Sequence, residues 1–302
     1  NWSTGDLPGT QDGDRVDLAG NAVWFGGQTV TVSGLSFGDF GRLTALSGWL
    51  GIDGPVSVAD TGAALSIDRS GQVWLDGYRD ADRLEIEVTG GRFANTGAVS
   101  GQVALSVGDN GQALLATSGG SFDLGAGSVL SLDGSRAVAG FDGRDGGAAV
   151  LRLHAGSTLE IVADTAGTTT LGEFRSGAFG ASPAVASAVA LGGTLRLDLS
   201  DWAPGRGGAV ETLIRADQIT GAFDDIEIIG LASDRGARIV IDHDADTVTL
   251  SLTSAGGGHG EISILAVGTG HAEDWSHHGA SRVLWTALSA DPPPALDDPL
   301  LY

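Results

Sequence analysis

Apolar and polar residues alternate in short stretches along most of the chain. In one of them Leu84, Ile86 and Val88 alternate with Glu85 and Glu87. Because successive side chains of a β-strand point to opposite faces, this pattern predicts a strand with one buried side and one solvated side. We expect the apolar residues to point inward and the two glutamates to face water. Such stretches, rich in β-branched residues, leave no room for long helices.

The apolar stretches recur at a nearly constant distance. One series of apolar positions has a 19-residue period, and a second series lies about half a period away from it. The first series is Leu46, Leu65, Leu84, Val103, Phe122 and Phe141, and the second is Val56, Leu75, Phe93, Leu114, Leu132 and Leu151. Two series with one period predict two strands in each repeating unit.

Turn-forming sequences such as Asp76-Gly77 and Asp133-Gly134 separate the two series. Glycine supplies the positive φ angles that tight corners require. A solenoid needs a constant register, because each coil stacks its inward residues on those of the next coil. The sequence therefore predicts an all-β fold, a right-handed parallel β-helix (β-solenoid) with about 19 residues per coil. A β-sandwich or another all-β fold is the alternative.

Two stretches resemble a known family. The opening NWSTGDLPGTQDGDRVDL is similar to the start of many bacterial surface β-helix proteins. The stretches GGTLRLDLSDWAPGRGGAVETLIRADQITGAFDDIEIIG and RIVIDHDADTVTLSLT resemble the C-terminal part of bacterial autotransporter passenger domains. The resemblance implies a β-helix that is displayed on a cell surface or shed from it. The residues after Leu252 are too few for a membrane barrel. The resemblance therefore implies that a barrel was cleaved away or that the protein is exported by another route.

The ends of a solenoid expose unpaired strand edges, which must be capped or used for assembly. We expect the segment with Trp2, Leu7 and Pro8 to form such a cap. The predicted parts are an N-terminal cap (1–13), solenoid repeats (14–190), passenger-like final coils (191–254), and a C-terminal extension with a Pro-rich tail (255–302). The tail is interpreted as an extended linker or docking arm.

The composition excludes several classes of mechanism. The 302 residues include no Cys and no Met, and all 16 basic residues are Arg. Disulfide scaffolds, thiolate metal sites and thiol nucleophiles are excluded, as are a Schiff-base lysine and a P-loop lysine. Because the sequence lacks Met, we expect a processed or excised product in which Asn1 follows a removed segment.

The chain is strongly acidic. Its 38 Asp and Glu residues give a net charge of −22, which opposes binding to a phosphate backbone or to an anionic lipid surface. We therefore expect no nucleic-acid partner. Because no apolar run approaches the ~18 residues of a membrane-spanning helix, we also expect no transmembrane segment in this chain.

A histidine-rich stretch near the C-terminus, GHAEDWSHHG, is a candidate metal site. Its candidate ligands are His271, Glu273 and His277. Imidazole and carboxylate groups on one face of the chain would suit Zn or Ni. The spacing matches no established metal signature, so a solvated polar turn is the alternative.

A second candidate metal site is an acidic stretch further upstream. Asp242, Asp244 and Asp246 occupy alternate positions, as in the first half of a calcium loop. The sixth position of that loop requires Gly, and Thr247 stands there. A plain turn between two strands accounts for the carboxylates equally well. Calcium is thus the one cofactor for which the sequence offers candidate ligands.

Carbohydrate chemistry is the main alternative function, because parallel β-helices often carry polysaccharide lyases and hydrolases. The residues that would line a sugar groove are Arg69, Arg79, Asp80, Asp82, Arg83, Glu85, Glu87 and Arg92. Carboxylates support glycoside hydrolysis only when they face one cleft, and the wet face of a strand explains them without catalysis. Three equally spaced tryptophans, Trp24, Trp49 and Trp74, do not follow the 19-residue period, so we expect them to fill or cap the core.

These observations predict an extracellular or cell-surface protein with a structural or adhesive role and no catalytic residues. Its expected partners are surface or extracellular glycans, or other copies of itself through the ends of the solenoid. The alternative is a carbohydrate-active β-helix enzyme or a glycan-binding protein of the tail-spike kind.

Overall fold

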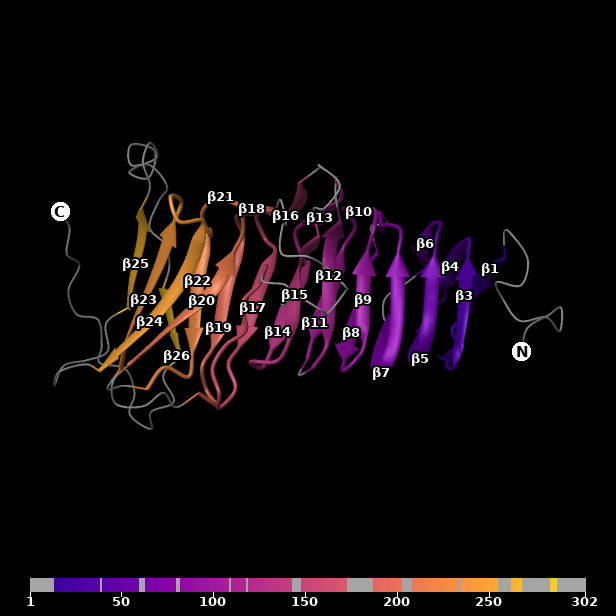
Figure 1. Cartoon of the computed structure of the whole chain (residues 1–302), viewed down its shortest axis with the longest axis horizontal. Coiled ribbons are helices and arrows are strands. Elements are labelled where there is room, and N and C mark those ends of the chain that lie inside the picture. The colour runs from indigo at the N-terminus through magenta and orange to yellow at the C-terminus, as the bar shows by residue number, and fades with distance from the viewer. Residues whose placement is uncertain are drawn as a thin grey trace.

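The computed structural model is a long stack of β-strands, with the first strands at one end and the last at the other (Figure 1). All regular elements of the described part are strands. The structure describes residues 14–38, 40–59, 63–79, 82–108, 110–117, 119–142, 148–172, 187–202, 208–232, 235–254, 262–267 and 283–286. The predicted all-β fold of stacked parallel strands is confirmed.

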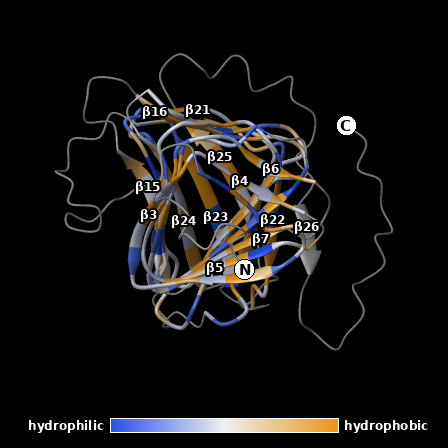
Figure 2. Ribbon diagram, turned by 90° about the vertical axis from the view of Figure 1, so that its right-hand side faces the viewer, coloured by the Kyte–Doolittle hydropathy of each residue, from blue (hydrophilic) through white to orange (hydrophobic). Residues whose placement is uncertain are grey.

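Three faces of parallel strands surround one interior, which is visible when the rod is viewed from its N-terminal end (Figure 2). Face 1 contains β2 (Ala22–Phe25), the first part of β5 (Arg42–Ile52), the first part of β7 (Ala64–Leu75), β8 (Leu84–Thr89), β11 (Val103–Val107), β14 (Val129–Asp133), β17 (Thr158–Val162), β19 (Thr194–Asp198), β22 (Asp225–Ile229) and β26 (Val283–Thr286). Face 2 contains β3 (Gln28–Val32), the second parts of β5 and β7, β9 (Arg92–Asn95), β12 (Gln112–Thr117) and β15 (Val138–Asp142). From β3 to β15, each coil passes through faces 1 and 2 and then through face 3, which is described next.

Face 3 consists of two separate sheets, one after the other along the rod. The first contains β1 (Arg15–Asp17), β4 (Gly34–Phe37) and β6 (Val56–Val58). The second contains β10 (Ala98–Val99), β13 (Ser121–Leu124), β16 (Ala149–Leu153), β18 (Ser187–Leu191) and β21 (Gln218–Gly221). A bridge between Tyr78 and Val99 of β10 extends the second sheet by one residue toward the first.

The strand direction changes at the C-terminal end. The sheet there contains β20 (Ala209–Arg215), β24 (Thr247–Ser254), β23 (Arg235–Asp242) and β25 (Ile262–Val267). β24 runs antiparallel to both β20 and β23, whereas β25 is parallel to β23. Residues 191–254, predicted as final coils, thus contain parallel strands followed by this antiparallel sheet. The proline-rich tail lies outside the described residues.

The predicted coil length of about 19 residues holds approximately in the N-terminal half of the rod and is wrong in the C-terminal half. The predicted interval does join β1 to β4 and β8 to β11, where Leu84 pairs with Val103. Other coils are longer. On face 1 Leu105 pairs with Leu130, and further along the rod Leu159 pairs with Leu195. The paired strands stay similar in length from coil to coil, so the additional residues lie in the corner segments.

The 19-residue series therefore moves from one face to another. Phe122 lies in face 3, where it pairs with Leu151, whereas Phe141 lies in face 2, where it pairs with Ala116. A coil that passes through three faces has three strands. The prediction of two strands per coil is thus wrong as well, although the alternation within each strand was interpreted correctly.

Two inward ladders on face 1 form the centre of the core. In each ladder, residues of successive coils pair in register and are buried, because every second residue of each strand is apolar. The first ladder is Leu43, Leu65, Ile86, Leu105, Leu130, Leu159, Leu195 and Ile226, and the second is Ala45, Ile67, Val88, Val107, Leu132, Ile161, Leu197 and Ile228. Each fully buried Leu or Ile stabilises the fold by about 1.5–3 kcal/mol.

Some buried positions are polar, and Asn95 is one of them. Asn95 is the last residue of β9 and is fully buried. Its Nδ2 donates to the carbonyls of Gly97 and Leu115, and its Oδ1 accepts from the backbone N–H of Gly77. The amide thus connects backbone groups of three successive coils, so its burial leaves no hydrogen-bonding atom of the side chain unsatisfied.

Candidate functional site

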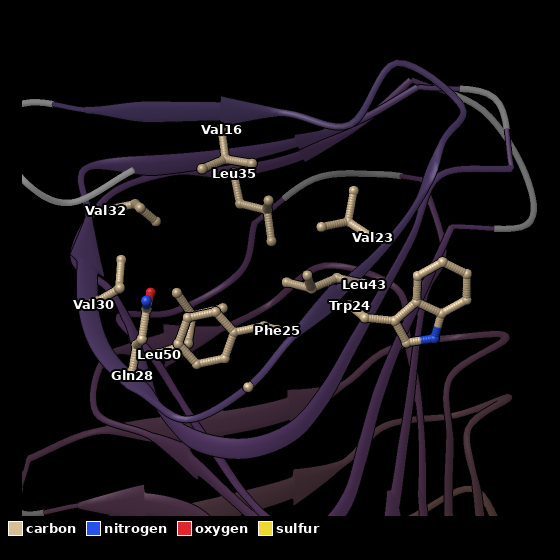
Figure 3. A pocket seen from close by; sticks show the side chains of 11 residues that line it. Val16, Val23, Trp24, Phe25, Gln28, Val30, Val32, Leu35, Leu43 and Leu50 are labelled. Atoms are coloured by element: carbon tan, nitrogen blue, oxygen red, sulfur yellow. The ribbon is translucent and has the colours of Figure 1, made fainter. Parts of the chain in front are cut away.

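The N-terminal end of the rod contains an apolar cavity of about 160 Å³ (Figure 3). Its lining comes from the first coil and from the coil beneath it. The lining residues are Val16, Val23, Trp24, Phe25, Gly26, Gln28, Val30, Val32, Leu35, Leu43 and Leu50. Phe25 and Leu50 lie side by side at one end of the cavity, and the indole of Trp24 lies on the other side of its strand (Figure 3). The cavity is the unfilled end of the hydrophobic core.

The first coil is also less buried than those that follow. Val23, Phe25 and Val30 are only partly buried and pack on the core cluster. Trp24 is 70% exposed. Among the described strands, β1, β2 and β3 each pair with a partner on one side only. Unpaired edges and exposed apolar groups mark this end as a place for a cap or for another molecule.

The tryptophans do not fill the core. Trp49 and Trp74 lie on face 2 with outward positions, because their neighbours Leu50, Val73 and Leu75 are the buried residues. The two indole rings have centroids 6.3 Å apart and an interplanar angle of 53°. The prediction that they fill the core is therefore wrong.

The sequence contained a signal for this aromatic pair. Trp49 pairs in register with Gln72, so the residue two positions further, Trp74, is its diagonal neighbour. The interval from Trp49 to Trp74 is thus the length of one coil, from Trp49 to Gln72, plus two residues, which return the side chain to the same side of the strand. The signal was missed because the interval was compared with the 19-residue period.

Polar residues follow Trp49 in its row along face 2. Trp49, Gln72, Arg92 and Gln112 pair in register on successive strands of face 2. All four are partly exposed. The side-chain oxygen of Gln112 is shielded from solvent and has no hydrogen-bond partner in the structure.

Face 1 carries the charged outward ladder. Arg196 lies between two glutamates, with its Nε 2.7 Å from Glu227 Oε2 and its Nη1 3.7 Å from Glu160 Oε1. Ser131 Oγ donates to Glu160 Oε2 over 3.0 Å. The hydrogen bond to Glu227 raises the pKa of the Arg196 guanidinium further above its usual range. These groups are paired with one another, as expected of a solvated face rather than of a catalytic site.

The proposed sugar groove is not assembled as one unit. Glu85 and Glu87 alternate with buried Leu84, Ile86 and Val88, which confirms that they form the wet face of β8. Arg83 precedes β8, and its Nε lies 3.9 Å from Glu85 Oε1.

Arg92 lies on β9 in face 2, apart from the face 1 residues of the proposed groove. Arg79 and Asp82 are exposed. Asp80 and the side chain of Arg69 lie outside the described residues. The described arginines and carboxylates of this stretch are thus divided between two faces.

The acidic stretch at 242–246 forms the turn between β23 and β24. Asp242 Oδ1 accepts from the backbone N–H groups of Asp244 and Ala245. Asp246 has a positive φ of 51°, and its Oδ1 accepts from the N–H of Ile219. Two of the three predicted calcium ligands thus hold backbone groups of the turn and of the neighbouring coil.

The other predicted metal ligands, His271, Glu273 and His277, lie outside the described residues. Within the described part, no group of three or more His, Asp or Glu side chains is arranged to hold a metal ion.

Two carboxylates near the C-terminal end have shifted pKa values, in opposite directions. Asp164 Oδ2 accepts from the N–H and the hydroxyl of Ser135 in the preceding coil, and its Oδ1 accepts from Ala166 and Gly167. Hydrogen bonding, first that from the Ser135 backbone, lowers the pKa of Asp164. Burial raises the pKa of Glu211 on β20. Asp164 therefore connects two successive coils through hydrogen bonds, and the sequence gave no signal of this role.

Comparison of the chain with protein-family models, with curated proteins and with solved structures finds no match. The resemblance to autotransporter passengers therefore stays a prediction. No helix among the described residues has the length and hydropathy needed to cross a bilayer.

Proposed function

We propose that the protein is an extracellular rod with a structural or adhesive role, which makes its contacts through its lateral faces and its ends. The observation that carries this proposal is the unbroken stack of ten strands on face 1, from β2 to β26. At ~4.8 Å per strand, this stack extends over roughly 43 Å. Such a rod presents large side surfaces, and these are suited to contacts with extended partners.

The surface chemistry supports the same role. The 38 acidic residues oppose binding to nucleic acid and to anionic lipid, and they favour solubility outside the cell. Export to the cell surface follows from the resemblance to passenger domains and agrees with a chain without cysteine. The apolar cavity and the single-sided strands of the N-terminal end offer a contact for another copy of the protein.

A bead assay tests the proposed function. Beads coated with the protein are expected to cluster with one another or to adhere to cells and to extracellular matrix. The control is the variant Ile161→Asp, which places a charge in the middle of the core and should unfold the rod. The proposal is contradicted if coated beads neither cluster nor adhere and if light scattering shows a monodisperse monomer at high concentration.

A further inference from the structure

We propose that the N-terminal half of face 2 is a binding surface for a sugar chain, with Trp49 and Trp74 as its stacking platform and Gln72 and Arg92 as its hydrogen-bonding groups. This inference deepens the proposed adhesive function, because it names the chemistry of one partner. It rests on the positions, packing and charge of these side chains.

The platform is held in place by the sheet itself. A Cβ atom added to Gly51 would lie only 2.4 Å from Trp49 Cη2, so the six-membered ring of Trp49 occupies the space above Gly51. Gly51 pairs in register with Trp74, which places both rings over the same part of face 2. Rings fixed in this way lose little conformational freedom when they bind a ligand. Indole faces suit the apolar C–H face of a pyranose ring, as they suit other flat or amphipathic partners.

The strand segments that carry the platform contain no negative charge of their own, and acidic residues come only at their ends, with Asp53 after β5 and Asp76 after β7. The strand segments of face 2 from β3 to β12 contain no Asp and no Glu, although the chain has 38 such residues. Arg92 is the charged residue among them. These strand segments therefore repel a neutral sugar or a uronate less than face 1 does, because glutamates face outward on face 1 along β8, β17 and β22.

The hydrogen-bonding groups follow the direction of the rod. Trp49, Gln72 and Arg92 pair in register on three successive strands, so their row is roughly 10 Å long. The amide of Gln72 offers both donors and an acceptor, and the Arg92 guanidinium is a donor suited to a carboxylate. Amphipathic rings beside a line of amide and guanidinium groups fit a short stretch of a sugar chain along the rod.

The platform has a clear boundary, and the strands that carry its two tryptophans have no free backbone edge. Ala94 and Leu114 point outward, since their neighbours Phe93 and Leu115 fill the core, and yet both are buried. The accessible platform therefore ends near Arg92. β7 is paired on both sides in this region, to β5 and β9, so a peptide cannot pair with the backbone of β7 beside the platform. This favours a ligand that binds through side chains.

Affinity electrophoresis tests the proposal with named polysaccharides in the gel. Neutral probes are xylan, galactomannan and a soluble β-glucan, and acidic probes are polygalacturonate and alginate. We expect at least one probe to retard the intact protein. The double variant Trp49→Ala/Trp74→Ala should weaken binding to that probe at least tenfold, or about 1.4 kcal/mol. Trp24→Ala is the matched control, because it removes an exposed tryptophan from face 1, and it should bind normally.

Two further variants separate the ligand classes and protect the test against misfolding. Gln72→Glu adds one negative charge to the proposed surface with little change in shape. It should weaken binding of the acidic probes more than binding of the neutral probes. Arg92→Gln removes the positive charge, so it should weaken binding of the acidic probes and leave binding of the neutral probes unchanged. Thermal unfolding is measured for each variant, because a purely structural aromatic pair would change the midpoint and leave binding intact.

The inference is overturned if no probe retards the intact protein, or if the double variant and Gln72→Glu bind as well as the intact protein. Bead clustering in the absence of any sugar binding would leave the proposed adhesive function standing while rejecting this surface. Sugar binding without bead clustering would leave this surface standing and reject self-association as the adhesive function.

Discussion

The two ends of the rod finish the hydrophobic core in different ways. At the C-terminal end β24 runs antiparallel to β20 and β23, and the apolar residues Ile239, Ile241 and Leu250 of this sheet belong to the buried core. At the N-terminal end the first coil keeps the parallel arrangement, and its interior is the cavity between Phe25 and Leu43. A solenoid is stabilised mainly by contacts between neighbouring coils. A terminal coil with one neighbour should therefore be the weakest part.

The largest expected difference in the free energy of unfolding comes from replacing a phenylalanine by alanine in the middle of the rod and at its N-terminal end. Phe93→Ala removes a fully buried ring and should lower the free energy of unfolding by about 3–5 kcal/mol. Phe25→Ala removes a half-buried ring beside the cavity and should cost about 1 kcal/mol. Urea unfolding measures both. Equal losses would show that the first coil is as tightly packed as the middle of the rod.

Two asparagines give a second matched pair. Asn95→Ala leaves the backbone groups of Gly77 and Leu115 buried without their partner and should cost about 2 kcal/mol. Asn21→Ala removes a hydrogen bond to the Leu18 carbonyl in the first coil, where water can replace it, and should cost about 0.5 kcal/mol. Thermal unfolding measures both. A loss at Asn21 as large as that at Asn95 would contradict the difference between the two regions.

The predicted cap provides the next test of the open end. Removal of residues 1–13 should expose the cavity and lower the stability of the first coil by about 1.5 kcal/mol. The measurements are binding of a hydrophobic dye and hydrogen exchange of β1 to β3. In the shortened chain, Val30→Leu partly fills the cavity and should reduce dye binding. Unchanged dye binding and exchange after the deletion would show that these residues do not cover the cavity.

The fold class was predictable from the sequence because alternation is a local property. Leu84, Ile86 and Val88 point inward for the same reason in any strand with one buried face. The longer coils of the C-terminal half were not predictable, because their length depends on corner segments whose residues leave no periodic signal. Phe122 and Phe141 keep the right spacing and lie on different faces. Once the register is lost, no argument from spacing can place Trp49 beside Trp74.

The site residues show the same limit. Asp242 and Asp246 were recognised as a turn or as a calcium loop, because both use closely spaced carboxylates. The structure shows the turn, through hydrogen bonds to backbone groups near and far in sequence. Asn95 and Asp164 gave no signal at all. Their partners lie one coil away, and only the register of the stack brings them together.

A smaller effect is expected where the last parallel coils meet the C-terminal sheet. Asp164 has a folded pKa below its unfolded value of about 3.9, so its hydrogen bonds stabilise the fold above that pH. This stability is lost as the pH falls through the folded pKa. Asp164→Asn should therefore cost about 1 kcal/mol at pH 7 and progressively less as the pH falls below the unfolded pKa. A loss that does not decrease as the pH falls would contradict this account, and urea unfolding at each pH measures it.

The smallest expected effect has the opposite sign. Burial raises the folded pKa of Glu211 above its unfolded value of about 4.3, so the fold is favoured at low pH and loses stability as the pH rises through the folded pKa. Glu211→Gln removes this penalty and should stabilise the protein by up to about 0.5 kcal/mol at pH 7, with no gain at pH 3. The lining of the N-terminal cavity contains no titratable group, so the same pH change should leave hydrogen exchange in the first coil unaffected by this substitution. A pH-independent effect of Glu211→Gln would show that the carboxyl is ionised as easily in the folded rod as in the unfolded chain.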